Sequence, residues 1–120
     1  MPHNLDIISL AKRNDNFRKV IKTGKHSQVV LMSLLPGEDI GNEVHETVDQ
    51  ILIFVAGEGK AKVGEEEFNI KEGTLAFVDS GTWHNFTNTG SIPMKLYTIY
   101  SPSNHPADRV QKSKPAVDDD

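Results

Sequence analysis

Cysteine is absent from the 120-residue sequence, which excludes disulfide bridges, thiolate metal clusters and a cysteine nucleophile. Any metal ion must therefore be bound by nitrogen and oxygen ligands. Long apolar runs are also missing, since the longest covers residues 51–56 and a membrane-spanning helix needs roughly 20 apolar residues. There is no basic excess, because 13 lysine and arginine residues face 17 acidic residues. The composition therefore favours neither a membrane protein nor a nucleic-acid-binding protein.

The length predicts one domain, residues 1–120, with a hydrophobic core of its own. We place this core at about residues 17–101. Residues 102–120 contain three prolines and end in three aspartates, which is typical of a polar tail. The first ten residues lack the basic start, apolar stretch and cleavage site of a secretory signal, so we expect a cytoplasmic protein.

Apolar residues at helical spacing predict a short helix over residues 4–14, with Asn4 as its cap and Asn14 as its end. The rest of the chain is dominated by β-branched and aromatic runs of strand length, separated by turns that contain glycine. The predicted strands cover residues 17–22, 28–35, 50–56, 59–63, 66–70, 74–79, 84–88 and 94–100. Many short strands of this kind predict an all-β sandwich, jelly roll or barrel.

Two spaced patterns stand out within this β region. The first is Gly37-x5-Glu43-x-His45-x4-Gln50-x6-Gly57, and the second is Gly73-x5-Asp79-x-Gly81-x2-His84-x3-Asn88. They resemble the two cupin motifs, Gly-x5-His-x-His-x(3 or 4)-Glu-x6-Gly and Gly-x5-Pro-x-Gly-x2-His-x3-Asn, and the spacings agree throughout. The resemblance covers roughly residues 29–100. It implies a double-stranded β-helix, which is a jelly-roll barrel whose mouth holds one metal ion.

Three positions depart from the cupin pattern: Glu43 replaces a histidine, Gln50 replaces a glutamate and Asp79 replaces a proline. Glu43 and His45 are two residues apart, so both side chains leave the same face of an extended strand and can share an ion. His84 would add an imidazole and Gln50 a weak, neutral amide oxygen. This set suits one divalent Fe, Mn, Ni or Zn ion. The alternative is a barrel without metal, in which Glu43 and Gln50 form only hydrogen bonds.

Side chains alternate between the two faces of a strand, so the position of a residue along its strand predicts which further side chains line a pocket at the barrel mouth. Tyr97 and Tyr100 are three residues apart, so only one of them can face the interior of a regular strand. His105 follows the last predicted strand closely enough to fold back over the barrel mouth. The candidate pocket residues are Leu52, Phe54, Phe86, Tyr97, Tyr100 and His105. For Leu52, Phe54 and Phe86 the alternative role is barrel core.

Among small cupins, the chain looks most similar to the phosphomannose-isomerase-like group. The chain has few side chains that could bind a phosphate group, because no arginine occurs between Arg18 and Arg109. We expect a small molecule to bind in the barrel mouth and to undergo isomerase, lyase or dioxygenase chemistry with the metal as Lewis acid. A non-catalytic ligand-binding or sensing cupin and a metal-free structural or interaction cupin remain the alternatives, since fold alone does not decide function.

We also expect a homodimer, because open jelly-roll barrels commonly cover a sheet edge and an apolar face by pairing. The charge distribution is compatible with a self-complementary contact. Residues 11–26 carry six basic side chains and one acid, whereas residues 36–79 carry eleven acids and three lysines. Solvated surface is the alternative explanation of this asymmetry.

Overall fold

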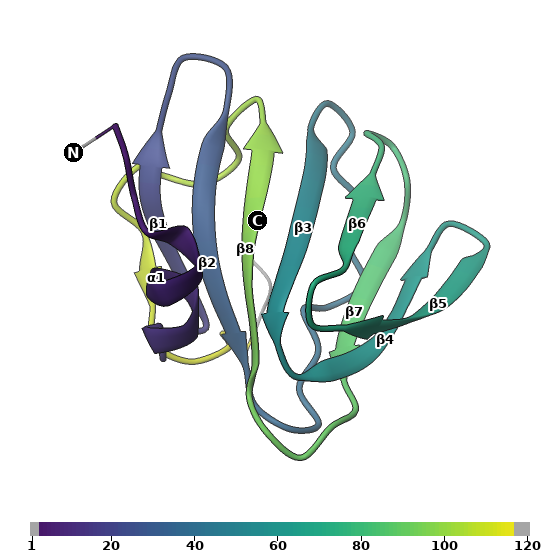
Figure 1. The fold of residues 1–120 in the computed structure, drawn as a ribbon. Helices are drawn as coiled ribbons and strands as arrows, with labels where there is room; N and C mark the ends of the chain where they lie inside the picture. Colours follow the sequence, from purple (N-terminus) through teal and green to yellow (C-terminus); the bar gives the residue numbers. More distant parts are fainter. Residues whose placement is uncertain (1–2, 117–120) are drawn as a thin grey trace.

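The computed structural model describes residues 3–116 of the chain. Within them, one short helix, α1 (Ile7–Arg13), precedes nine strands (Figure 1). The strands are β1 (Arg18–Thr23), β2 (Gln28–Leu34), β3 (Asp49–Ala56), β4 (Glu58–Val63), β5 (Glu66–Lys71), β6 (Leu75–Val78), β7 (His84–Asn88), β8 (Met94–Ser101) and β9 (Val110–Gln111).

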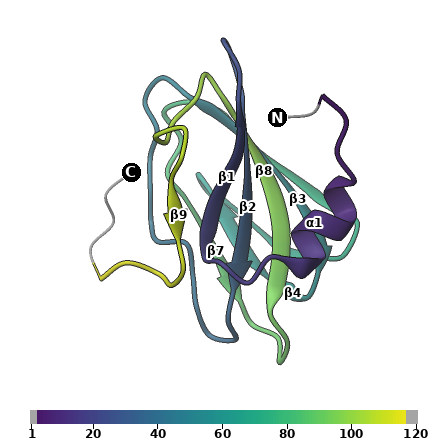
Figure 2. The same ribbon diagram turned by 90° about the vertical axis from the view of Figure 1, so that its left-hand side faces the viewer.

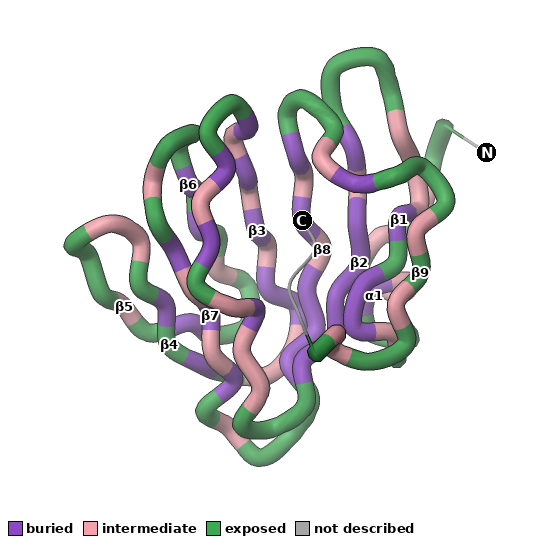
Figure 3. Tube along the Cα trace, turned by 180° about the vertical axis from the view of Figure 1, so that it is seen from behind, coloured by how far each residue is buried: buried purple, intermediate pink, exposed green. Residues whose placement is uncertain are grey.

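The strands form two antiparallel sheets that enclose the core. The larger sheet has the order β6-β3-β8-β2-β1-β9, and the smaller has the order β5-β4-β7. Buried segments lie mainly along the strands, whereas the turns are mostly exposed (Figure 3). The predicted all-β jelly-roll barrel is therefore confirmed.

The strand register of the larger sheet decides which side chains enter the barrel. Side chains alternate between the two faces of a strand, so residues paired across neighbouring strands share a face. One buried row consists of Val30, Thr98, Leu52 and Ala76. The next interior row consists of Gln28, Tyr100, Gln50 and Val78. This second row puts three polar side chains on the inner face of the sheet, next to Thr98 of the first row.

The helix is shorter than predicted, and its cap is Asp6 instead of Asn4. The Asp6 carboxylate accepts a hydrogen bond from the Ser9 backbone N–H at 3.3 Å, which satisfies one of the donors at the helix start. Asn14 ends the helix as predicted. No helix in the described part of the chain is long and apolar enough to span a membrane.

All eight predicted strands are present, with ends within one residue of the prediction. The additional strand β9 lies in the predicted tail and pairs with β1, with Arg18 opposite Gln111 (Figure 2). The tail is therefore docked along the barrel as far as it is described. Residues 117–120, which include the three terminal aspartates of the predicted tail, lie outside the described residues.

Candidate metal centre

Backbone hydrogen bonds hold the two sequence motifs against each other. Glu43 and His84 form an antiparallel bridge in which each backbone N–H donates to the other residue's carbonyl at 2.9 Å. The Gly81 N–H donates to the His45 carbonyl at 2.8 Å. Gly81 has a φ of 81°, a left-handed conformation that glycine adopts without a steric penalty. This turn therefore fixes the segment that carries the first histidine next to the strand that carries the second.

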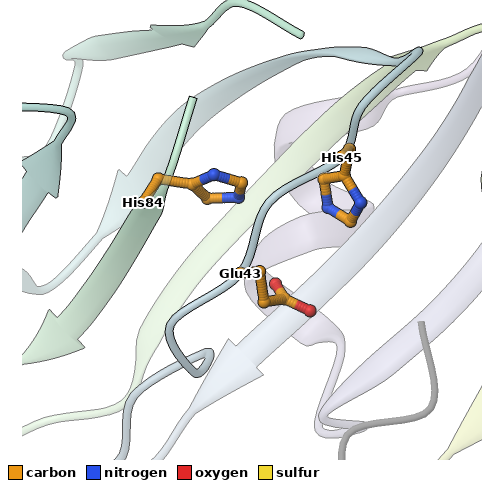
Figure 4. A group of neighbouring side chains, drawn as sticks. All are labelled: Glu43, His45 and His84. Atoms are coloured by element: carbon orange, nitrogen blue, oxygen red, sulfur yellow. The ribbon is translucent and has the colours of Figure 1, made fainter. Parts of the chain in front are cut away.

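The side chains of Glu43, His45 and His84 converge inside the barrel (Figure 4). One potential ligand atom from each residue lies within 4.8 Å of the other two, and all three residues are buried. The two imidazole rings are 5.4 Å apart between centroids and are tilted by 46°. The residues singled out by the motif spacing are thus brought together in space, although residues 43–45 lie outside any of the named strands.

The tautomer of the neutral His84 ring is set by a backbone carbonyl. Its Nδ1 lies 3.0 Å from the Thr82 carbonyl oxygen, which can only accept, so Nδ1 carries the hydrogen. Burial lowers the pKa of His84 below its ordinary value, which favours the neutral ring. Its Nε2 therefore presents a lone pair, and this buried atom has no hydrogen-bond partner. A neutral imidazole oriented through its other nitrogen is the form that binds metal ions.

A second buried atom without a hydrogen-bond partner is Oε2 of Glu43. A carboxylate oxygen buried in this way costs free energy unless a cation or donor compensates it. A divalent ion between Glu43 and His84 would satisfy both the carboxylate oxygen and the imidazole nitrogen. The donor types, two imidazoles and one carboxylate, also match those of borderline divalent metals. The residues present therefore fit a metal ion.

Gln50 lies on the interior face of β3, and 1% of its surface is exposed. Its Nε2 donates to the Thr98 hydroxyl at 3.1 Å and to the Tyr100 hydroxyl at 3.2 Å. The Tyr100 ring in turn makes an edge contact with His45, with 5.9 Å between the ring centroids. Gln50 therefore belongs to the polar network next to the cluster. Its Oε1 is a third buried atom without a hydrogen-bond partner.

The two tyrosines of β8 face opposite sides of the sheet. Tyr100 is buried in the interior row described above, whereas Tyr97 lies on the outer face and packs against the cluster formed with α1. Tyr97 is therefore not a pocket residue. This corrects its place among the candidates.

The three apolar candidates of the pocket are part of the main core cluster. Leu52, Phe54 and Phe86 are each at most 1% exposed. Phe86 is in contact with the site, because its ring centroid lies 6.1 Å from that of His84. Leu52 and Phe54 pack in the core around it, as the barrel-core alternative expected.

His105 folds back over the interior and is 5% exposed. Its ring makes an edge contact with Tyr100 at 5.0 Å between centroids. The segment is held by the Gln28 side chain, whose Oε1 accepts from the backbone N–H groups of Asn104 and His105 at 3.1 and 3.0 Å. Gln28 Nε2 donates to the His105 carbonyl at 2.7 Å and to Thr23 Oγ1 at 2.9 Å. We call these four hydrogen bonds the Gln28 clamp.

Sequence reasoning missed Gln28 and Thr98, which support the site from β2 and β8. For Gln28, the signal in the sequence is a glutamine at the start of a strand that is apolar apart from Ser33. Thr98 lies between Leu96 and Tyr100 on the interior parity of its strand, where an apolar residue is the usual choice. In each case a polar residue at an inward position marked a hydrogen-bond network.

The family model for the cupin domain matches residues 30–100. Over 119 residues the chain is 44% identical to the uncharacterized protein YrkC of Bacillus subtilis (strain 168), covering 94% of this chain and 64% of that protein. It is 38% identical over 107 residues to an uncharacterized protein of Acanthamoeba polyphaga mimivirus, covering 86% of this chain and 67% of that protein. The chain therefore spans about two thirds of the length of these two relatives.

Among solved structures, the fold is similar to that of BH2720 from Bacillus halodurans. The TM-score is 0.93 and the identity is 39%, with 95% of this chain and 91% of that chain covered. Both motifs lie within the matched family region, and the barrel has the expected jelly-roll sheets. The chain belongs to the cupin family.

Proposed function

We propose that the protein is a metal-dependent cupin that binds a small molecule at an ion held by Glu43, His45 and His84. The observation that carries this proposal is the convergence of three buried ligand atoms from two separate motifs within 4.8 Å. The Gln50 amide oxygen is proposed as a fourth, weaker ligand. Support for it comes from its burial and from the fixed orientation of its amide.

Charge narrows the class of ligand that such a site would take. Two neutral imidazoles, one amide and one carboxylate leave a divalent ion with one uncompensated positive charge. A ligand that brings an anionic or strongly polarised oxygen, such as a carboxylate or an enolate, would complete this balance. The ligand set is compatible with Fe, Mn, Ni or Zn, because imidazole and carboxylate together suit all four ions.

The bound ion would act as a Lewis acid that polarises an oxygen of the bound molecule. The chain's own contribution is to hold the donors in place: Thr82 orients His84, and Tyr100 packs against His45. The buried surroundings exclude water and strengthen electrostatic interactions at the site. This arrangement supports isomerase, lyase or dioxygenase chemistry, and binding without turnover would use the same residues.

The proposal is tested by elemental analysis of protein purified without added metal. We expect about one Fe, Mn, Ni or Zn ion per chain, held by the protein ligands with a position left open for the small molecule. His84→Ala should remove the ion while the β-sheet circular dichroism spectrum is kept. His26→Ala, which changes an exposed histidine outside the cluster, should retain the ion. A wild-type protein that neither contains an ion nor gains thermal stability from any of the four would refute the proposal.

A further inference from the structure

A cavity of about 210 Å³ lies between the start of β1 and the segment that follows β9. Its described lining residues belong to three segments of the chain: residues 17–18, 40–41 and 114–116. Figure 2 shows β9 next to β1, on the side away from α1. Glu43, His45 and His84 are not among the lining residues, so the cavity is separate from the candidate metal centre.

Arg18 brings a buried positive charge to this cavity. It lies on the interior face of β1, paired with Met32 of the main core cluster, and is 1% exposed. Its Nη1 donates to the Gln111 side-chain oxygen at 2.6 Å, and its guanidinium lies 5.1 Å from the centre of the Phe17 ring. Moving a guanidinium from water into such surroundings costs free energy, which an anion beside it offsets.

Lys114 lines the same cavity and has its own counter-ion. Its Nζ donates to the Asp39 carboxylate. Hydrogen bonds from the Asn85 amide and from Lys114 lower the pKa of Asp39, so this carboxyl is ionised at neutral pH. Asp39 thus balances Lys114, while Arg18 contributes a single positive charge to the cavity wall. A ligand with a single negative charge matches this wall.

Two walls of the cavity are fixed by hydrogen bonds within the chain. On the loop side, Asn85 Nδ2 donates to Asp39 Oδ2 and its Oδ1 accepts from the Gly41 N–H, each at 3.0 Å. On the tail side, the Phe17 N–H donates to the Lys112 carbonyl at 3.3 Å, and β9 pairs with β1. The cavity is therefore formed before a ligand enters, as is usual for small-molecule sites.

We propose that this cavity binds a small monocarboxylate with a compact apolar group, of which benzoate is an example. The planar guanidinium binds two coplanar carboxylate oxygens. Phe17, Ile40 and Pro115 provide apolar contacts for the remainder of the molecule. An apolar cavity of about 150 Å³ holds benzene. The volume of about 210 Å³ thus also accommodates the carboxylate. The site is additional to the metal centre and independent of it.

Calorimetric titration of the full chain with benzoate tests the site, and benzamide serves as a neutral molecule of the same shape. We expect one benzoate per chain with a dissociation constant of roughly 1 mM or lower, and binding of benzamide at least about 10-fold weaker. In nuclear magnetic resonance spectra, benzoate should shift the amide signals of Gly41 and Lys114. Weaker binding of benzoate, or equal affinity for benzamide, would overturn the proposal.

Arg18→Met removes the charge and keeps a long side chain, so benzoate should bind at least about 10-fold more weakly and no better than benzamide. The barrel should stay folded, because replacing a buried ion with an apolar side chain is often neutral or stabilising. Lys114→Gln leaves Asp39 unbalanced and should weaken benzoate binding by about 3-fold. Lys112→Gln, at an exposed lysine nearby, should have no effect. Unchanged affinity in Arg18→Met, or in Lys114→Gln if Arg18→Met does not fold, overturns the proposal.

Two further variants separate this site from other places where a carboxylate could bind. Benzoate could bind a metal ion instead, so its affinity should persist in His84→Ala, and loss of binding there overturns the cavity as the site. The chain's own carboxylates at Asp118, Asp119 and Asp120 are a second source of the same chemistry. If benzoate binds only after all three are changed to asparagine, the cavity serves the chain itself, and a site for a free carboxylate is overturned.

Discussion

The Thr98 hydroxyl fixes the orientation of the Gln50 amide. It donates its hydrogen to the Ile51 carbonyl at 2.9 Å, so its oxygen can only accept from Gln50. The group that faces Thr98 must therefore be the amide nitrogen, and the amide oxygen must face elsewhere. A hydrogen bond, and not a metal ion, thus sets the direction of this oxygen. The proposed fourth ligand is oriented before an ion arrives.

Thr98→Val tests this relationship with a side chain of nearly the same shape. Loss of the acceptor frees the amide to rotate, so we expect metal affinity to fall by about 3- to 10-fold and stability by roughly 1 kcal/mol. Thr98→Ser keeps the hydroxyl and should bind metal like the wild type. Competition with a fluorescent chelator gives the affinities, and urea unfolding gives the stabilities. Equal affinity in Thr98→Val and Thr98→Ser would show that the amide orientation does not matter.

Gln50→Glu should have opposite effects on the metal-free and the metal-bound protein. In the metal-free barrel a carboxylate oxygen replaces the donor that faces Thr98, and a second acid enters the site near Glu43. We expect a loss of roughly 1–3 kcal/mol in the free energy of unfolding. With metal, the added negative charge should raise affinity by about 10-fold at pH 8, with a smaller gain near pH 6 as carboxyl protonation competes. Affinity no higher than wild type at pH 8 would count against Gln50 as a ligand.

The sequence predicted the barrel well because its strands are defined by local patterns. β-branched and aromatic runs ended by glycine turns placed eight strands within one residue. The ligand cluster could be predicted for a different reason, since Glu43, His45 and His84 occupy fixed positions in two spaced motifs. The strand β9 was missed because it has only two residues, and its pairing with β1 depends on a contact about 90 residues away in sequence.

Side-chain direction was the harder problem. Parity showed that Tyr97 and Tyr100 face opposite sides, but the choice between them depended on the register with β3. Asn4 was predicted as the helix cap, but asparagine and aspartate are equally good caps, so residue type does not separate Asn4 from Asp6. The tertiary packing of Ile7, Leu10 and Ala11 against Leu31 then decided where the helix begins. Such features follow from contacts between distant segments and have no local signature.

The burial of His84 predicts how the stability of the metal-free protein depends on pH. Its pKa is lowered in the folded state, so between that value and about 6.5 the unfolded chain binds more protons. The free energy of unfolding should therefore be level above about pH 7 and fall as pH drops below 6.5. Urea unfolding with a chelator from pH 8 to 5 measures this change. His84→Gln removes the titrating ring, so its free energy of unfolding should depend less on pH. A pH dependence identical to that of the wild type would contradict this prediction.

Bound metal should make the stability of the protein depend more steeply on pH, because His45 and His84 must both be neutral to bind an ion. An ion that binds only the folded barrel raises the melting temperature by mass action. We expect the increase caused by Ni(II) or Zn(II) to be largest near pH 8 and to shrink toward pH 5. The measurement is the melting temperature with and without metal at each pH. An increase undiminished at pH 5 would exclude a site with two histidine ligands.

Gln28→Ala should release the segment that carries His105. The substitution removes all four hydrogen bonds of the Gln28 clamp and leaves buried backbone groups without partners, which costs roughly 2–4 kcal/mol. We expect faster hydrogen exchange at residues 104 and 105 and faster proteolysis near Pro106, with the other strands still protected. Ser103→Ala, an exposed change in the same segment, is the control. Unchanged exchange at His105 would show that other contacts hold the tail.

In the Gln28 clamp, a side-chain amide takes the role that a neighbouring strand has elsewhere in the sheet. The backbone groups of residues 104 and 105 are therefore held largely by one glutamine, whereas the strands around it are held by continuous backbone pairing. Such a segment can open while the barrel stays folded, because the free energy of a local opening is set by local bonds. The rate at which an ion or ligand enters and leaves would then be a separate property from the stability of the fold. Substitutions at position 28 would change residence time at the site without changing the ligands that determine what is bound.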